Sequence, residues 1–327
     1  MSLSAADEDL AASVRHGERR ALAKAITLLE STRRDDRMRA DALLNTLLPA
    51  TGKALRLGIS GVPGAGKSTF IETLGLHLIE RGRRVAVLAV DPSSSVSGGS
   101  ILGDKTRMER LSVQEAAYIR PSPSGGTLGG VAEKTREAML VCEAAGFDTV
   151  IVETVGVGQS ETAVAGMTDI FVLLQLPNAG DDLQAIKRGV MEIADVIVVN
   201  KADLDADAAT RARMTLTSAL RTFAMHGRGD SQPPVLQASA LQGMGIAEFW
   251  AAVERIIGER RASGAFDARR RGQALDWLWD NVRARLLADF HAHPGVRAAL
   301  AGTLQDVSEA RVAPSAAARA LLDLFEH

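Results

Sequence analysis

The chain has 327 residues, 46% of them hydrophobic, which allows one large domain or two with a substantial buried core. Its formal net charge of −2 argues against a nucleic-acid-binding surface, and its single cysteine, Cys142, excludes an internal disulfide. The acidic N-terminus lacks the apolar segment of a secretory signal, and no run approaches the about 18 apolar residues of a membrane span, so we expect a soluble, cytoplasmic protein.

The first fifty or so residues are expected to be helical. Gly17 separates two short amphipathic segments, and a third apolar stripe, from Met38 to Leu48, ends at Pro49 and Gly52. These patterns predict an N-terminal helical extension over residues 1–53.

Strands and helices alternate over residues 54–260. The predicted strands are short and mainly apolar: Leu55–Ile59, Val85–Val90, Thr149–Val152, Ile170–Leu174, Val196–Val199 and Val235–Ala238. Strands that are apolar on both faces belong to a parallel sheet covered by helices on either side. Cys142 lies in an apolar helical stretch between two of them, so we expect it to be a small core residue. The sequence thus predicts an α/β fold with a doubly wound, mainly parallel sheet.

After Gly264 the pattern becomes purely helical. One face of a predicted helix carries the apolar residues Leu275, Leu278, Val282, Leu286 and Phe290. Residues 261–327 are therefore predicted to form a C-terminal helical extension.

Two further features of this extension are open to more than one interpretation. Trp277 and Trp279 point in different directions on a helix, so they pack within one chain or one of them faces a second surface. The basic run Arg269-Arg270-Arg271 is short and follows Asp267, so we expect a solvated helix start rather than a site for a nucleic-acid phosphate backbone.

A phosphate-binding loop follows the first predicted strand. Gly61-Val62-Pro63-Gly64-Ala65-Gly66-Lys67-Ser68 completes the pattern G-x-x-x-x-G-K-[ST], and Thr69 continues into a helix. The glycines let backbone N–H groups surround a polyphosphate, and the helix N-terminus adds partial positive charge. We expect Lys67 to reach the β- and γ-phosphates and Ser68 to bind Mg²⁺. This pattern predicts a P-loop NTPase sheet that binds a nucleoside triphosphate.

A second motif, Asn200-Lys201-Ala202-Asp203, follows a predicted buried strand and points to guanine. In that place Asp203 accepts hydrogen bonds from guanine N1–H and the 2-amino group, which adenine lacks, and such a site can discriminate by roughly 10⁴-fold. Asn200 is expected to tie this loop to the phosphate loop, and the stem of Lys201 to cover the base. Ser239-Ala240-Leu241, after the last strand, is placed for a backbone N–H to meet guanine O6. We therefore predict that the ligand is GTP rather than ATP.

Carboxylates at strand ends supply candidate metal ligands. Asp91 and Glu153 each follow a predicted buried strand, where a carboxylate is placed to hold Mg²⁺ or to orient the attacking water. The alternative for both is a helix-cap or turn carboxylate. Gly156 is placed to donate its N–H to the γ-phosphate. The position of the water-orienting glutamine of small signalling GTPases is Val157 here, which predicts slow hydrolysis until a partner reshapes the site.

With these residues in place, the chain resembles the MeaB/ArgK family of metallochaperone-type P-loop GTPases, some of which are named LAO/AO transport system ATPases or kinases. The matching stretches are Gly61–Thr69, Asp91–Ser94, Gly98–Met108, Ile119–Pro121, Thr127–Gly130, Glu153–Glu161 and Asn200–Asp203. The resemblance implies a homodimeric GTPase chaperone of adenosylcobalamin-dependent methylmalonyl-CoA mutase. Such a chaperone gates cofactor loading and protects or reactivates the mutase, and its C-terminal extension mediates dimerisation.

The resemblance also implies two switch regions. Gly98–Met108 is similar to switch I, where Asp104 would join the Mg²⁺ ligands. Gln175–Arg188 is similar to an additional switch that couples the nucleotide state to the mutase, and Gln184 and Lys187 lie three apart on its expected helix. A solvated, charged helix start is the alternative for this second region.

Two other functions fit parts of the pattern. A nickel metallochaperone GTPase needs thiolate and imidazole ligands at a surface, and Cys142 inside an apolar helix supplies no such cluster. A transport-linked arginine or ornithine kinase needs a substrate pocket and has no use for a guanine-selective motif. The sequence therefore favours a Mg²⁺-dependent GTPase that is slow alone and stimulated by its partner.

Overall fold

The computed structural model describes residues 3–90, 108–121, 128–154, 160–177, 188–224 and 232–326. The chain divides into two compact units, Met1–Arg269 and Arg270–His327. The finer division at residues 53 and 260 stays a prediction.

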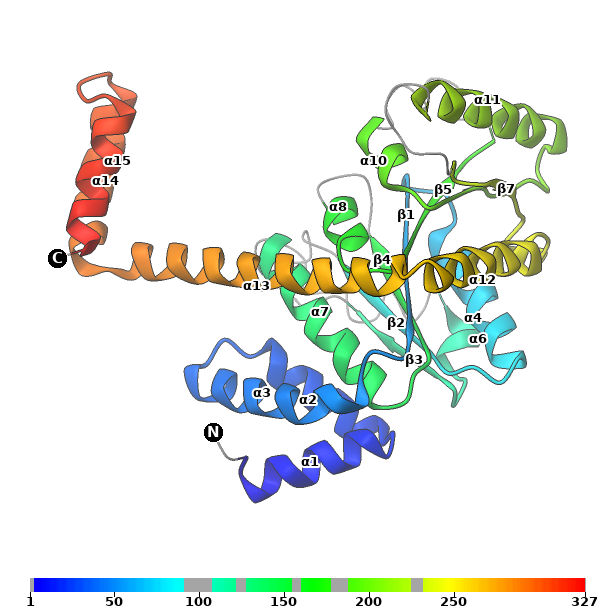
Figure 1. The fold of residues 1–327 in the computed structure, drawn as a ribbon, viewed down its shortest axis with the longest axis horizontal. Helices are drawn as coiled ribbons and strands as arrows, with labels where there is room; N and C mark the ends of the chain where they lie inside the picture. Colours follow the sequence, from blue (N-terminus) through cyan, green and yellow to red (C-terminus); the bar gives the residue numbers. More distant parts are fainter. Residues whose placement is uncertain are drawn as a thin grey trace. The chain divides into compact units, whose positions relative to one another are not determined.

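A seven-stranded parallel sheet forms the centre of the first unit (Figure 1). Its strands are β1 (Leu55–Gly61), β2 (Val85–Val90), β3 (Ala117–Arg120), β4 (Thr149–Thr154), β5 (Ile170–Gln175), β6 (Val196–Val199) and β7 (Val235–Gln237). They follow the order β3-β2-β4-β1-β5-β6-β7, and every neighbouring pair is parallel. The predicted α/β class with a doubly wound parallel sheet is confirmed.

Strand β3 was not predicted from the sequence. It has only four residues, lies at the edge of the sheet and pairs with β2 alone among the described strands. Its last residue is Arg120, whose guanidinium forms an ion pair with Glu30. A strand that is this short and ends in a paired charge shows no extended apolar run, which is why periodicity alone does not detect it.

Helices cover both faces of the sheet (Figure 1). One face carries α7 (Leu128–Ala144), α8 (Ser160–Ala165), α10 (Arg188–Ile193) and α11 (Ala206–Ala224); the other carries α4 (Lys67–Glu80), α6 (Glu109–Ser112) and α12 (Ile246–Ala262). Successive strand residues alternate between the two cores: Phe171 packs in the first and Val172 in the second. The sheet is thus buried on both sides, as its apolar strands predict.

The N-terminal helices pack against α7. They are α1 (Ala5–Arg15), α2 (Arg19–Glu30) and α3 (Arg34–Leu47), followed by the 3₁₀ turn η1 (Leu48–Ala50). Leu22, Ile26 and Leu29 of α2 are buried in the same core as Cys142 of α7. Burial raises the pKa of the Cys142 thiol, and the expected role of this residue as a core side chain is confirmed.

The second unit consists of helices. Most of α13 (Ala265–Ala292) belongs to it, together with α14 (Pro294–Ser308) and α15 (Pro314–Glu326). The predicted end of α13 before His293-Pro294 is confirmed, because His293 is the N-cap of α14. The predicted apolar stripe is largely exposed in the single chain, since Leu275, Leu278 and Leu286 each expose more than half of their surface.

The expectation of a solvated start for α13 is wrong for Arg269. Its Nε donates to the carbonyl of Thr168 and its Nη2 donates to the carbonyl of Ala165, both at 3.1 Å. Ala165 is the last residue of α8 and Thr168 follows it, so Arg269 fastens the first turn of α13 to the end of α8 within the first unit. Sequence periodicity does not show such a contact because its partners lie about a hundred residues away.

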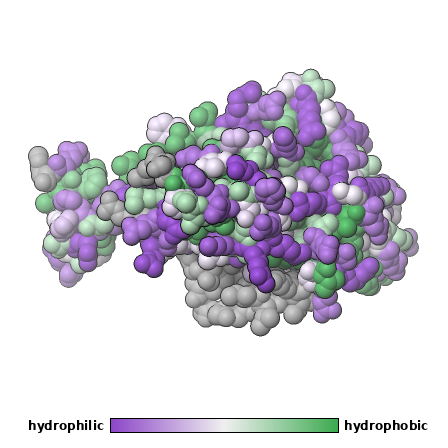
Figure 2. Space-filling view, turned by 90° about the horizontal axis from the view of Figure 1, so that it is seen from below, coloured by the Kyte–Doolittle hydropathy of each residue, from purple (hydrophilic) through white to green (hydrophobic). Residues whose placement is uncertain are grey.

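No helix in the described part of the chain combines the length and apolar character that crossing a bilayer requires. On the face drawn in Figure 2, hydrophilic residues cover most of the described surface and hydrophobic ones form scattered patches.

Candidate nucleotide-binding site

The candidate site lies at the carboxyl ends of the central strands. The chain builds β2, β3 and β4 on one side of β1 and β5, β6 and β7 on the other, so the strand order changes direction at β1. In open α/β sheets this switch point is where a crevice forms and ligands bind. The phosphate loop leaves β1 at that place.

The phosphate loop is shaped by two close backbone approaches. A Cβ on Gly61 would lie 2.5 Å from the carbonyl oxygen of Leu174, and a Cβ on Gly66 would lie 2.7 Å from Nδ2 of Asn200. Gly66 also has φ of 85°, a left-handed conformation that favours glycine, and it is the N-cap of α4. The first N–H groups of α4 therefore face the loop with no capping side chain before them, which suits an anion.

Lys67 is held inside this loop. It is the first residue of α4, is 8% exposed, and donates from Nζ to the carbonyl oxygens of Gly61 at 2.8 Å and Val62 at 3.4 Å. Pro63 and Gly64 form the exposed tip, whereas Ala65 is buried. The ammonium group is thus already placed among the backbone groups that would surround a polyphosphate.

Ser68 and Glu153 meet beside the loop. Oγ of Ser68 donates to Oε1 of Glu153 at 3.2 Å, and Glu153 is buried at the end of β4. A hydroxyl and a carboxylate are the hard oxygen ligands that Mg²⁺ prefers, so this donor pair fits the predicted metal. The other predicted ligands, Asp91 and Asp104, lie outside the described residues, as does Gly156.

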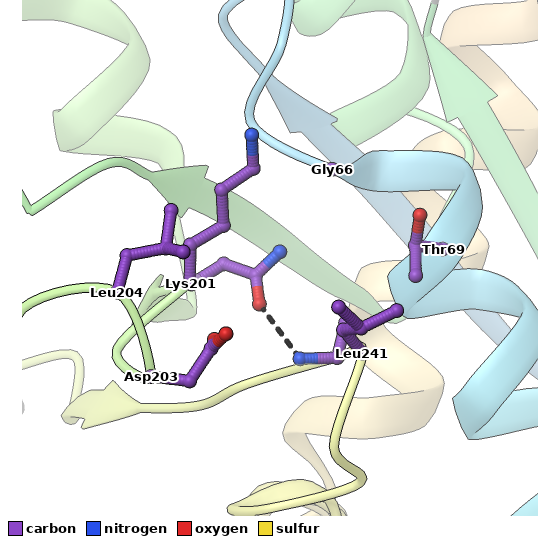
Figure 3. Close-up of a pocket in the computed structure, with 8 residues that line it drawn as sticks. Gly66, Thr69, Lys201, Asp203, Leu204 and Leu241 are labelled. Carbon is purple, nitrogen blue, oxygen red and sulfur yellow. Dashed lines mark hydrogen bonds between the residues drawn. The ribbon is translucent and has the colours of Figure 1, made fainter.

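A cavity of about 240 Å³ opens beside the phosphate loop (Figure 3). Its lining residues are Gly66, Thr69, Asn200, Lys201, Asp203, Leu204, Ala240 and Leu241. Figure 3 shows the side chain of Lys201 extending toward the phosphate loop, with Asp203 farther from that loop. Lys201 has φ of 59°, which is rare for a residue with a side chain and is concentrated at functional sites.

Asn200 joins three loops of the site. Its Nδ2 donates to the carbonyl of Ala65 at 2.8 Å, and its Oδ1 accepts from the N–H of Ala240 at 3.0 Å (Figure 3). The side chain is 1% exposed, so both bonds are shielded from water. The structure therefore brings together the phosphate loop, the N-K-x-D loop and the segment Ser239–Leu241.

The segment Ser239–Leu241 follows β7 and forms a tight loop. The N–H of Ser239 donates to the carbonyl of Met244, and the N–H of Gln242 donates to Oγ of Ser239. Ser239 and Ala240 are buried, whereas Leu241 is 81% exposed at the mouth of the cavity. The remaining predicted residues, Gln184 and Lys187, lie outside the described part of the chain.

Two residues of the site were not predicted. Leu204 lines the cavity and is 76% exposed; its position directly after Asp203 is the signal that was available. Thr73 on α4 donates from Oγ1 to the carbonyl of Ala240 at 2.7 Å. Thr73 lies one helical turn after Thr69, but its partner is 167 positions away, so only the folded structure reveals the contact.

Comparison with known proteins agrees with this geometry. The family model described as "Methylmalonyl Co-A mutase-associated GTPase MeaB" matches residues 22–295. The chain is 47% identical over 314 residues to the GTPase ArgK of Escherichia coli (strain K12), covering 96% of this chain and 95% of that protein.

Two further relatives support the same assignment. The mitochondrial methylmalonic aciduria type A homolog of Mus musculus is 46% identical over 322 residues, which is 95% of this chain and 77% of that protein. A crystal structure of a LAO/AO transport system kinase is 39% identical, covers 100% of both chains and has a TM-score of 0.79. The suspected resemblance is confirmed, and the chain belongs to the MeaB/ArgK family of methylmalonyl-CoA mutase-associated GTPases.

Proposed function

We propose that this protein binds and hydrolyses GTP and acts as a chaperone of an adenosylcobalamin-dependent methylmalonyl-CoA mutase. In this role it gates cofactor loading and protects or reactivates the mutase. The proposal that the nucleotide is GTP is supported mainly by the hydrogen bonds of Asn200, which join the phosphate loop to the loop after β7. Asp203 and Gly66 of the phosphate loop line the same cavity. The mutase part is supported by the description of the family and by the name of the mouse relative.

The base and the phosphates would bind to separate groups. Asp203 would accept from guanine N1–H and the 2-amino group, and Lys201 would cover the base with its stem. The loop Gly61–Ser68 would surround the phosphates with backbone N–H groups. Lys67, whose ammonium group lies against the loop carbonyls, would neutralise charge on the β- and γ-phosphates.

A magnesium ion would be held by Ser68 and Glu153, together with Asp91 and Asp104. When bound, Mg²⁺ neutralises negative charge on the phosphate oxygens. Charge neutralisation and positioning are the main requirements of phosphoryl transfer. The N–H of Gly156 is proposed to donate to the γ-phosphate. With Val157 in place of a water-orienting glutamine, we expect slow intrinsic hydrolysis and stimulation by the partner.

The partner would sense the nucleotide through Gln184 and Lys187, which the family resemblance assigns to the additional switch. A ligand shifts a conformational equilibrium only by its differential affinity for the two states, so the mutase must bind one nucleotide state better than the other. The exposed apolar residues of α13, including Leu275, Leu278 and Trp279, support the proposal of a homodimer formed through the C-terminal helices.

Two rival functions are less well supported. A nickel metallochaperone needs accessible thiolates, and Cys142 is fully buried with a raised pKa. A transport-linked arginine or ornithine kinase is suggested by the name of a structural relative, the LAO/AO transport system kinase.

Phosphate release tests the reaction and separates the kinase. The purified protein is incubated with Mg²⁺ and either GTP or ATP, with and without arginine. We expect slow release from GTP, little from ATP, and no effect of arginine. An arginine-dependent phosphorylated product would contradict the proposal.

Co-purification tests the partner. We expect purified methylmalonyl-CoA mutase to be retained by this protein, with a different yield in GDP and in a non-hydrolysable GTP analogue. Lys187→Ala should weaken mutase stimulation and leave intrinsic hydrolysis nearly intact, whereas Lys53→Ala, at an exposed lysine before β1, should change neither. Equal stimulation of the Lys187→Ala variant would remove Lys187 from the coupling role.

A further inference from the structure

A threonine of the phosphate-binding helix holds the loop at the base cavity. Oγ1 of Thr73 lies 2.7 Å from the carbonyl oxygen of Ala240 and 3.0 Å from the carbonyl oxygen of Thr69, four residues earlier on α4. A hydroxyl has a single hydrogen and donates to one acceptor at a time. The shorter distance is the commonest one for O–H···O bonds, so the geometry favours Ala240 as the acceptor.

This bond completes the anchoring of Ala240. The N–H of Ala240 donates to Oδ1 of Asn200, and Asn200 in turn donates to the carbonyl of Ala65. Ala240 is only 3% exposed, so its two polar backbone groups depend on these protein partners. The loop is consequently fastened to the phosphate loop through Asn200 and to the helix that follows it through Thr73.

The same bond sets the direction of a neighbouring N–H. The carbonyl of Ala240 and the N–H of Leu241 belong to one planar peptide group, and no cis peptide bond occurs in the described chain. In a trans peptide these two groups point in opposite directions. A carbonyl turned toward Thr73 therefore turns the Leu241 N–H away from Thr73.

That N–H is the available donor of the loop. The N–H groups of Ser239, Ala240 and Gln242 donate to Met244, Asn200 and Ser239, respectively. Of the N–H groups from Ser239 to Gln242, only that of Leu241 has no acceptor among the described residues. Leu241 itself lines the cavity.

We infer that Thr73 is a positioning residue for base selection: its hydroxyl orients the Ala240–Leu241 peptide so that the Leu241 N–H donates to an oxygen at C6 of a purine. This inference rests on the proposed guanine binding and assigns part of the selectivity to a residue that does not touch the nucleotide. Adenine carries an amino group at C6, which donates rather than accepts, so the same orientation disfavours ATP and ADP.

The test compares two guanine nucleotides that differ only at C6. In 6-thio-GDP a sulfur, which is a weak acceptor, replaces the oxygen, while N1–H and the 2-amino group remain for Asp203. Binding of GDP and 6-thio-GDP is measured by calorimetry for the full-length wild type, Thr73→Val and Thr73→Ser, and ADP binding is measured for the wild type as well. Valine keeps the branched shape of threonine without the hydroxyl, and serine keeps the hydroxyl.

We expect Thr73→Val to weaken GDP binding roughly threefold to tenfold, the range for one hydrogen bond, and to weaken 6-thio-GDP binding much less. The preference for GDP over 6-thio-GDP should therefore be smaller in Thr73→Val than in the wild type. In Thr73→Ser it should be close to the wild-type value. Thr217→Val, which removes a helical hydroxyl that bonds only to the carbonyl of Arg213 among the described residues, should leave both affinities unchanged.

Two outcomes would overturn the inference. If Thr73→Val weakens both nucleotides equally, or changes neither, the hydroxyl does not act on base selection. A loss of fold is recognised separately from the melting temperatures of the variants. If the wild type does not prefer GDP over ADP, the proposed guanine binding is wrong. If the wild type prefers GDP but Thr73→Val keeps the wild-type preference for GDP over 6-thio-GDP, only the role of Thr73 is wrong.

Discussion

The amino ends and the carboxyl ends of the parallel strands form two opposite sides of the central sheet, which we call its amino edge and its carboxyl edge. The carboxylates of these two edges have different roles. At the amino edge, Asp148, Asp169 and Asp195 each directly precede a strand, and each accepts a hydrogen bond from a backbone N–H at the start of the neighbouring strand. These N–H groups belong to Arg84, Arg56 and Phe171, at 2.9, 2.8 and 2.8 Å, respectively. The carboxylates of this edge are thus committed to the fold.

At the carboxyl edge the acidic side chains face the candidate site. Glu153 lies beside the Ser68 hydroxyl, and Asp203 lines the cavity next to the phosphate loop. Residue type alone therefore does not identify a functional carboxylate in this fold. The edge of the sheet on which the residue lies decides its role, because parallel strands gather their carboxyl ends, and the loops that bind ligands, on one side.

Arginines at the amino edge extend the contrast. Arg260 of α12 donates to the carbonyl of Asp169 at 2.6 Å and forms an ion pair with Asp195, and Arg269 holds the end of α8. Substitutions at the amino edge should therefore change stability without changing nucleotide affinity, and substitutions at the carboxyl edge should do the reverse.

The largest expected effect is on base preference. Asp203→Asn should reduce GTP affinity by roughly 10³-fold and increase xanthosine triphosphate affinity, because an amide donates to the second carbonyl of xanthine. Competition binding with both nucleotides measures the exchange. Asp207→Asn, at an exposed residue of α11, is the matched control. Unaltered GTP affinity in Asp203→Asn would remove this residue from base reading.

The next effect is on phosphate binding. Lys67→Ala should weaken GTP binding or lower its turnover by roughly 10²-fold, because the charge that neutralises the phosphates is lost. The unfolding midpoint should stay close to that of the wild type, and Lys53→Ala should behave like the wild type in both assays. Normal GTP hydrolysis by Lys67→Ala would contradict the assignment.

The amino edge is tested with Asp195→Ala. The variant loses the bond to the Phe171 N–H and leaves Arg260 without its carboxylate partner, which should reduce the free energy of unfolding by about 2 kcal/mol. Urea denaturation measures the loss, with Asp9→Ala on the exposed side of α1 as control. If Asp195→Ala instead had unchanged stability and a lower GDP affinity per folded molecule, the proposed difference between the two edges would be wrong.

The smallest effect concerns a carboxyl group at neither edge. Glu137 on α7 is buried beside Lys134, and burial raises its pKa to about 7, against the opposing effect of the lysine. The folded protein then holds this proton more tightly than the unfolded chain, so the group reduces stability as pH rises from about 4.5 to about 7.

Glu137→Gln should remove that decline. Relative to the wild type, its free energy of unfolding should rise by about 1–2 kcal/mol between roughly pH 6 and pH 8, while GDP affinity stays unchanged. Glu248→Gln, at an exposed position of α12, should retain the wild-type decline. Parallel pH profiles for the wild type and Glu137→Gln would show that Glu137 does not titrate in this range.

Much of the fold follows from local sequence. The apolar runs predict six of the seven strands, and the end of α13 before Pro294 follows from proline chemistry. Strand β3 reads Ala-Tyr-Ile-Arg and so lacks the unbroken apolar run that reveals the equally short β6. The attachment of Arg269 to Ala165 and Thr168 is non-local, so the sequence indicates only a charged helix start.

The candidate site also has features that local sequence predicts and features that depend on contacts between distant parts of the chain. Gly61–Ser68 and Asn200–Asp203 are contiguous motifs whose residue types suffice to suggest their chemistry. The contact of Thr73 with Ala240 joins helix α4 to a loop that only the folded sheet brings beside it, and no spacing rule predicts it. Asp91, Asp104, Gly156, Gln184 and Lys187 stay predictions because they lie outside the described residues.

Calorimetric titration of the wild-type protein with GDP and ADP in the presence of Mg²⁺ tests whether the site selects guanine. If Asp203 and the phosphate loop form one guanine-nucleotide site, GDP should bind and ADP should bind at least about 100-fold more weakly. Tight binding of ADP without measurable binding of GDP would contradict the account.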